Sequence, residues 1–236
     1  MSLPDGATLR PSGESAFVVE FGDTIDPIAG AKVAALAAAF DAAAPAGLIE
    51  VVPTFRSLLV IFDPDETGRD TLLSALDMAR GAAEPAPPKT YQIPVALDGD
   101  AAEDIDAAAS GLSLSPDALR KQFLAGAYTV GMYGFAPGFA YLSGVDPSLA
   151  IPRRPQPRPP MPAGSVILAG GMAALTSISM PTGWYVIGKT ALTLFRPDAR
   201  PMVPFAVGDT LHFTRVSEAD LAALSKSADG GLTELP

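Results

Sequence analysis

Residues 131–144, GMYGFAPGFAYLSG, combine four glycines and one proline with four aromatic side chains. Glycine reaches backbone conformations that other residues avoid, and proline fixes one dihedral angle, so this composition is typical of a shaped loop. If every ring packed inward, the polar backbone of the loop would need other partners, and exposed aromatic groups often mark a binding surface. The stretch therefore predicts either core packing or a wall against a ligand or partner, formed by Phe135, Pro137, Phe139 and Tyr141.

The segment that follows this loop is rich in proline and arginine. Residues 152–162 contain six prolines and three arginines, so we expect an extended, polyproline-like conformation. Arg153, Arg154 and Arg158 lose little conformational entropy when a stiff backbone holds them, which suits bidentate binding of a carboxylate or a phosphate. The alternatives are an acidic partner surface or plain solvation, because exposed arginines are often only solvated.

Around these two segments, the second part of the chain is expected to be mostly β-structure with two or three helices. An acidic run, residues 98–106, precedes an Ala-rich helix and predicts solvated capping rather than a metal site, because carboxylates favour the positive end of the helix dipole. A closing helix is expected at Val216–Ser225, followed by a polar tail. Strands are expected at Tyr91–Leu97, Tyr128–Tyr133, Ser165–Ala169, Trp184–Ile187, Leu192–Phe195 and Asp209–Arg215.

The first part of the chain predicts the order β-β-α-β-β-α. Asp26 offers a capping carboxylate directly before Pro27, which suits the first position of a helix. Residues 81–88 hold three prolines and three alanines, so a domain boundary is expected there. We predict an α+β fold with a small α/β domain at residues 1–84, a Pro-rich linker at residues 85–90 and a second domain at residues 91–236.

Composition narrows the chemistry that the chain can carry. Its 236 residues are 48% apolar, enough for a sizeable core, and a net charge of −10 argues against a nucleic-acid or anionic-membrane partner. The lack of cysteine and the single histidine, His212, exclude disulfides, thiolate catalysis and most zinc or Ser-His sites, so no metal is expected. No apolar run reaches the roughly 18–20 residues that span a bilayer, and Met1–Glu20 lacks a signal-peptide pattern, so a cytoplasmic location is expected.

One nucleotide-binding pattern occurs in an unsuitable context. Gly183–Thr190 matches G-x-x-x-x-G-K-T, the phosphate-binding loop, but its inner residues favour a strand and strand-like residues follow, whereas that loop opens a helix. We therefore expect a strand with Lys189 near its end, where the ammonium group contacts an anion or is solvated. No histidine base for Ser165 is visible in the sequence, so we expect Ser165 to form hydrogen bonds rather than to act as a nucleophile.

Several motifs, in this order, resemble the allophanate hydrolase subunit 1 family. This family also includes the B subunit of 5-oxoprolinase and the Kip-type inhibitor of a sporulation histidine kinase. The resemblance covers nearly the whole chain. Its motifs are residues 19–26 (VEFGDTID), 134–142 (GFAPGFAYL), 152–154 (PRR), 157–158 (PR), 162–166 (PAGSV), 169–170 (AG), 183–184 (GW) and 187–190 (IGKT).

The resemblance implies a small α/β N-terminal domain and a cyclophilin-like β-barrel as the second domain. It implies a subunit of an ATP-dependent amide or lactam hydrolase of the 5-oxoprolinase or allophanate hydrolase type, which works with a related partner subunit and, in 5-oxoprolinase, with a lactam-opening subunit. ATP is the implied cofactor, bound by this chain or by the complex. No catalytic residue is assigned. The implied substrate-binding or partner-binding residues are Phe135, Pro137, Phe139, Tyr141, Arg153, Arg154, Arg158, Ser165, Trp184 and Lys189.

Three positions depart from the pattern of this family. Phe123 stands where a histidine is usual, residues 171–176 read GMAALT in place of GQTGxY, and residues 97–100 read LDGD in place of YGGE. Met172 and Ala173 lack the polar groups of glutamine and threonine, so a substrate contact made there would be lost. These changes predict a diverged substrate or, as the alternative function, a non-catalytic regulatory module that resembles the Kip-type kinase inhibitor.

Overall fold

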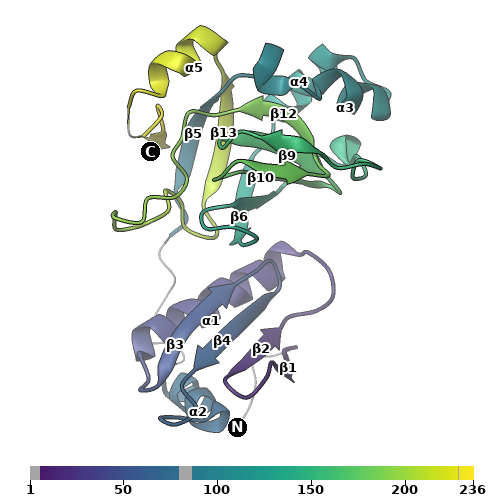
Figure 1. The fold of residues 1–236 in the computed structure, drawn as a ribbon. Helices are drawn as coiled ribbons and strands as arrows, with labels where there is room; N and C mark the ends of the chain where they lie inside the picture. The colour runs from purple at the N-terminus through teal and green to yellow at the C-terminus, as the bar shows by residue number, and fades with distance from the viewer. Residues whose placement is uncertain (1–5, 80–86, 228) are drawn as a thin grey trace. The chain divides into compact units, whose positions relative to one another are not determined.

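The computed structural model describes residues 6–79, 87–227 and 229–236. The chain divides into two compact units, Met1–Pro87 and Pro88–Pro236 (Figure 1). The predicted boundary segment, residues 81–88, and the start of the predicted linker at residues 85–90 lie largely outside the described residues.

The first unit is a four-stranded antiparallel sheet with two helices. Across the sheet the strands follow in the order β1 (Thr8–Pro11), β2 (Ala16–Glu20), β4 (Ser57–Phe62) and β3 (Leu48–Pro53). Helix α1 (Pro27–Ala43) packs against β3 and β4, and helix α2 (Arg69–Ala79) packs against α1. The predicted order β-β-α-β-β-α is confirmed.

Local signals explain where these elements form. Helix α1 begins where the sequence predicts, since Asp26 Oδ1 accepts a hydrogen bond of 2.9 Å from the Ile28 N–H. On β2 and β4 buried side chains alternate with partly exposed ones, as expected for a sheet with one face on a core. Phe17 of β2 and Leu58 of β4 are fully buried in that core.

The second unit is built around one eight-stranded mixed sheet (Figure 1). Its order is β12-β9-β10-β7-β6-β13-β5-β14, so β12 and β14 are the edges of an open sheet, and β13 pairs with β5 in parallel. The bounds are β5 (Thr90–Val95), β6 (Tyr128–Tyr133), β7 (Ala140–Ser143), β9 (Ser165–Ala169), β10 (Met172–Leu175), β12 (Tyr185–Lys189), β13 (Thr210–Arg215) and β14 (Thr233–Leu235).

Shorter elements surround this sheet. Strands β8 (Arg158–Met161) and β11 (Met180–Thr182) pair with each other. The helices are α3 (Ile105–Gly111), α4 (Pro116–Leu124) and α5 (Glu218–Leu224), with short 3₁₀ turns at η1 (Gly99–Ala102) and η2 (Pro147–Leu149). The prediction of a mostly β second part with two or three helices, the last of them at the expected place, is confirmed.

Two hydrophobic clusters use opposite faces of the strands around β9. Alternate side chains of a strand point to opposite faces of the sheet. Val166 and Leu168 of β9 belong to the main core of the second unit, whereas Ile167 between them belongs to a second cluster that includes Phe139 and Trp184. The face opposite the main core therefore carries the loop between β6 and β7, residues 134–139, which we call the aromatic loop.

The strand predicted at Leu192–Phe195 is wrong. Leu192 and Leu194 are buried while Thr193 is exposed, which is the alternation of a strand, but residues 191–196 form no ladder in the described structure. Side-chain burial alone produced that pattern. The sequence also missed the short strands β7, β8, β10 and β11, and β14 in the expected tail; β8 (RPPM) and β10 (MAAL) have low β propensity.

Candidate binding surface

Four aromatic side chains form a continuous row in the second unit, and we call them the aromatic surface: Phe135, Phe139, Tyr141 and Trp184. The ring centroids of Phe135 and Phe139 are 5.7 Å apart, and those of Phe139 and Tyr141 are 4.8 Å apart. Tyr141 lies edge-on to Trp184 at 6.0 Å. Tilted and edge-on pairs are the arrangements that aromatic rings favour, so the row is a packed unit.

Phe135 occupies a strained backbone conformation at the exposed end of this row. Its φ is +70°, and across it the Ala136 N–H donates to the Gly134 carbonyl at 2.9 Å, which makes a tight γ-turn of the rare kind. Residues with a Cβ disfavour this conformation. Phe135 is nevertheless 75% exposed, so it recovers little from burial. Its exposed ring is a candidate contact for another molecule.

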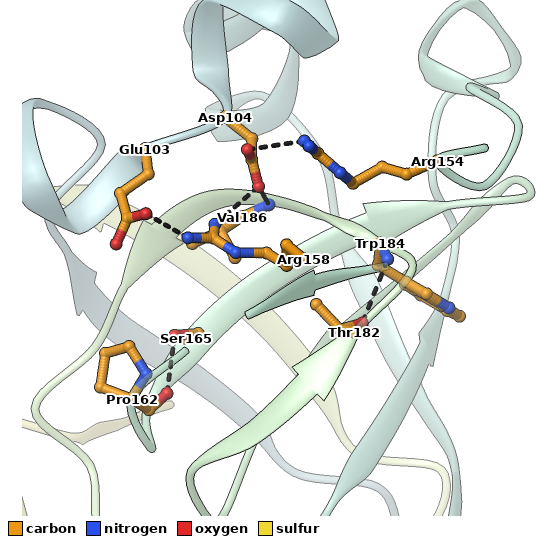
Figure 2. A network of polar contacts seen from close by, with 9 residues as sticks. All are labelled: Glu103, Asp104, Arg154, Arg158, Pro162, Ser165, Thr182, Trp184 and Val186. Carbon is orange, nitrogen blue, oxygen red and sulfur yellow. Dashed lines mark hydrogen bonds and ion pairs between the residues drawn. The ribbon is translucent and has the colours of Figure 1, made fainter. Parts of the chain in front are cut away.

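Two arginines of the proline-rich segment bind one buried carboxylate (Figure 2). Arg154 Nη1 donates to Asp104 Oδ1 at 2.7 Å, and Arg158 Nη1 donates to Asp104 Oδ2 at 2.7 Å. The Val186 N–H also donates to Asp104 Oδ2, at 2.9 Å. Asp104 is 8% exposed, so the prediction that the acidic run is merely solvated is wrong at this residue. A buried carboxylate requires such charged and hydrogen-bonded partners.

Glu103 adds a second acid to this group, and we call Glu103, Asp104, Arg154 and Arg158 the Asp104 cluster. Glu103 pairs with Arg158 Nη2, and its side chain is 48% exposed. Burial lowers the pKa of the Arg158 guanidinium, but the contacts with Glu103 and Asp104 outweigh this and raise its pKa overall. Arg158 therefore stays charged. Figure 2 shows the indole of Trp184 pointing away from these ion pairs.

Arg153 and Arg154 contact consecutive aromatic residues at the start of β12. The Arg154 N–H donates to the Gly183 carbonyl at 2.7 Å. The guanidinium carbon of Arg154 is 5.3 Å from the Tyr185 ring centroid, and that of Arg153 is 5.8 Å from the Trp184 ring centroid. Within the described part of the chain, the ion pairs include Arg154 but not Arg153. Arg153 therefore places a cation at the Trp184 end of the aromatic surface.

Ser165 and Lys189 lie opposite each other on β9 and β12. Ser165 is buried, and its Oγ donates to the Pro162 carbonyl at 2.7 Å. The Ser165 N–H donates to Thr176 Oγ1 at 3.0 Å. The hydroxyl therefore stabilises the turn between β8 and β9. Among the ion pairs of the described residues, none includes the Lys189 ammonium group.

The G-x-x-x-x-G-K-T match does not form a phosphate-binding loop. Residues 185–189 are strand β12, and no helix follows directly within the described residues. The Lys189 N–H donates to the Ala96 carbonyl at 2.9 Å, and the Thr190 N–H donates to the Gly164 carbonyl at 2.8 Å. These donors are already used, so this segment does not fit the phosphates of ATP. The expected strand with Lys189 near its end is confirmed.

The structure brings together some of the predicted site residues and separates others. Phe139, Tyr141, Trp184 and Arg153 adjoin one another, and the exposed Pro137 belongs to the same loop. Arg154 and Arg158, grouped with them from sequence, bind Asp104 instead. Sequence reasoning missed Glu103 and Asp104. The signal that marks them is charge complementarity between the acidic run and the arginines.

The departures from the family pattern fall in different environments. Phe123 is fully buried, and its ring lies 5.0 Å from both Tyr128 and Phe213. This position therefore belongs to the main core. Met172 is on β10 and packs against the second cluster, which includes Phe139. A change at residue 172 therefore bears on the aromatic surface more directly than a change at residue 123.

Membrane-spanning helices and metal-binding groups are both absent from the described residues. None of their helices is long and apolar enough to cross a membrane. In the same part of the chain, no group of three or more His, Cys, Asp or Glu side chains is arranged to hold a metal ion.

This fold and these motifs define a carboxyltransferase-type domain. Residues 7–205 match the family described as carboxyltransferase domain, subdomain C and D. The B subunit of 5-oxoprolinase from Bacillus subtilis (strain 168) is 36% identical over 230 residues, which cover 92% of this chain and 96% of that protein. The chain therefore belongs to the carboxyltransferase subdomain C and D family, and the family resemblance seen in its sequence is confirmed.

Solved structures show the same fold within longer chains. The crystal structure of TTHA0988 matches with a TM-score of 0.77 and 30% identity, over 89% of this chain and 40% of that chain. This chain thus spans about 40% of the length of that protein. The urea carboxylase of Kluyveromyces lactis matches with a TM-score of 0.75 over 97% of this chain and 24% of that chain. Its identity is 17%, so this likeness concerns the fold alone.

Proposed function

We propose that this chain is a subunit of an ATP-dependent hydrolase of the 5-oxoprolinase or allophanate hydrolase type, and that it works with a related partner subunit. Support comes from the family and from the Bacillus subtilis relative, which is named as the B subunit of 5-oxoprolinase and is matched over 96% of its length. The word subunit in that name implies a complex. A lactam-opening subunit is a further expected partner, and a cytoplasmic location is expected for the complex.

The aromatic surface is the part through which we expect the chain to act. The observation that carries this assignment is Phe135, an apolar residue that is 75% exposed on a strained backbone. We assign to Arg153, which lies over Trp184, the binding of an anionic group of the substrate or partner. Arg154 and Arg158 support it from the Asp104 cluster. The full proposed set has Phe135, Pro137, Tyr141, Arg153 and Lys189 as contacts, and these are supported by Phe139, Arg154, Arg158, Ser165 and Trp184.

ATP is proposed to bind to the complex rather than to the phosphate-loop pattern of this chain. Support comes from the Lys189 and Thr190 N–H groups, which already donate to carbonyls of this chain. Calorimetric titration of ATP into the chain alone and into the reconstituted complex tests this. Binding by the chain alone that Lys189→Ala abolishes would contradict it.

We also propose a finer architecture, in which residues 91–236 form a cyclophilin-like barrel after a small α/β domain at residues 1–84 and a linker at residues 85–90. Support comes from one backbone pair between Ala96 and Lys189, with N–H···O distances of 2.9 Å in both directions. This pair links the segment after β5 to the edge strand β12, far apart in the sheet order. A structure of the complex that shows β12 unpaired with this segment would contradict a barrel.

Reconstitution tests the proposed activity. The chain is co-expressed with candidate partner subunits, and ATP-dependent loss of 5-oxoproline is measured. We expect turnover that requires this chain and that Phe135→Ser reduces. A lack of turnover with every reconstituted partner would contradict the hydrolase. Binding of the isolated chain to a histidine kinase, with lowered autophosphorylation, would support the regulatory module instead.

A further inference from the structure

The position of Arg153 depends on how its own segment is held. We call residues 152–158 the arginine segment. Three of its seven residues are prolines, which have no N–H to donate to a β-ladder. Before β8 begins at Arg158, the described backbone bonds tie this segment to the residues between β11 and β12 through one donor, the Arg154 N–H to the Gly183 carbonyl. The backbone alone therefore anchors the segment weakly.

Asp104 supplies the contacts that the backbone lacks. Its carboxylate binds the guanidinium groups of Arg154 and Arg158, one on each oxygen at 2.7 Å. Asp104 is itself fixed to β12, since its Oδ2 accepts from the Val186 N–H at 2.9 Å and its N–H donates to the Val186 carbonyl at 3.0 Å. Contacts thus run from β12 through Asp104 to the arginine segment (Figure 2).

This anchoring determines where Arg153 points. Consecutive residues of an extended chain project to opposite sides. Because Arg154 is directed toward Asp104 and Tyr185, Arg153 is directed toward Trp184, where its guanidinium carbon lies 5.8 Å from the ring centroid. Asp104 and Glu103 neutralise the other two arginines of the segment, so the charge of Arg153 remains available.

We propose that Asp104 is a positioning residue, which holds the arginine segment so that Arg153 lies over Trp184 with its guanidinium free for an anionic group. The inference rests on the binding role proposed above for the aromatic surface. A single guanidinium pairs bidentately with a carboxylate or a phosphate, so the ligand carries one of these groups beside an apolar part that meets the exposed ring of Phe135. Asp104 does not touch that ligand. It acts through Arg154 and the backbone of the arginine segment.

Trp184 reports on this arrangement because it is the one tryptophan of the chain. The residue is 6% exposed, and Arg153 lies over its ring, so we expect movement of Arg153 to increase the exposure of the indole to solvent. The emission maximum and the acrylamide quenching constant of the full-length chain measure this exposure. Neither readout requires enzymatic turnover, so a failure of the proposed function leaves this test intact.

Three single variants separate positioning from general destabilisation. Arg153→Ala gives the reference, a red shift of Trp184 emission and an increased quenching constant. Asp104→Asn is expected to give most of the same shift and increase. Glu103→Gln is the matched control, since Glu103 contacts Arg158 from a half-exposed position, and wild-type values are expected. The double variant of Arg153→Ala with Asp104→Asn should change Trp184 no further than Arg153→Ala alone.

Two outcomes overturn the proposal. One is a folded Asp104→Asn chain with wild-type Trp184 emission and quenching. The other is a double variant whose changes equal the sum of the single variants, because Asp104 would then act on Trp184 through β12 rather than through Arg153. If circular dichroism shows that Asp104→Asn does not fold, Arg154→Gln takes its place, since it breaks the same link and leaves Arg158 on Asp104. Wild-type Trp184 signals in Arg154→Gln overturn the proposal equally.

Discussion

A Cβ atom on Gly138 would lie 2.6 Å from the carbonyl oxygen of Leu194, a separation that real Cβ atoms essentially never show. The aromatic loop therefore packs backbone to backbone against residues 194–195. Gly138 also has a φ of +75°, a left-handed conformation that L side chains rarely adopt. The close approach and the conformation together require glycine, and they fix the loop that displays Phe135.

A left-handed alanine costs about 1–2 kcal/mol. We expect Gly138→Ala to lower the free energy of unfolding by more than this, because the clash with Leu194 adds to the strain. Gly170→Ala is the matched control, since Gly170 has a φ of +60° and nothing within 4 Å of an added Cβ. Urea unfolding of both variants measures the difference. Equal losses would show that the contact with Leu194 relaxes without cost.

Asp104→Ala should be among the most destabilising single changes in the second unit. It leaves the guanidinium groups of Arg154 and Arg158 without their shared carboxylate, which costs about 3–5 kcal/mol for a buried pair. Glu103→Ala, at a half-exposed position, should cost about 0–1 kcal/mol. Denaturant unfolding compares the two. Similar losses would mean that burial of Asp104 contributes nothing beyond a surface ion pair.

We expect the buried Tyr128 to make the folded chain less stable at alkaline pH. Burial raises the pKa of its phenol above the ordinary value of 10.0, with the charge of Asp146 as a smaller cause. Because the folded-state pKa is the higher one, this contribution to stability is fully present below about pH 10 and falls as pH rises above it. We therefore expect the free energy of unfolding of the wild-type chain to fall as the pH rises above about 10.

The variant Tyr128→Phe tests this cause. Near neutral pH it should lose about 0.5–1.5 kcal/mol, because the Phe123 carbonyl loses the 2.7 Å hydrogen bond from the phenol. Across the alkaline range it should lose less stability than the wild-type chain, because it has no phenol to ionise at this position. Urea unfolding near neutral pH and in the alkaline range gives the comparison. Identical alkaline losses of stability in the two chains would rule out Tyr128 as their source.

Phe135→Gly should separate stability from function. Relief of the left-handed strain stabilises the folded chain by about 1–2 kcal/mol, whereas the flexibility of glycine in the unfolded chain costs about 0.5–1 kcal/mol. The free energy of unfolding should therefore stay equal or rise slightly. In the reconstituted complex, kcat/KM for 5-oxoproline should fall roughly tenfold, a loss of about 1.4 kcal/mol of binding. Ile49→Ser, which changes a residue 64% exposed in the first unit, should leave kcat/KM unchanged. Equal effects of the two variants would argue against a specific role for Phe135.

Signals carried by neighbouring residues determined a large part of this protein. The cap at Asp26 and the β-rich runs that became β2 and β4 predicted the first unit, because both signals act over a few residues. The composition of residues 131–144 predicted a shaped aromatic loop, and Gly138 and Phe135 adopt left-handed conformations within it. Motifs spread along the chain also identified its family, which the match of residues 7–205 confirms.

Tertiary structure alone decided which charges meet and which rings are buried. Asp104 lies 50 residues from Arg154 and 54 from Arg158, so the local rule for acids near a helix start predicted solvation where the fold builds a buried cluster. Leu192–Phe195 alternates like a strand but has no strand beside it in the described structure. Turns, caps and alternation depend on adjacent residues, and the sequence determines them directly. Burial and charge pairing depend on distant segments brought into contact, which only the folded chain specifies.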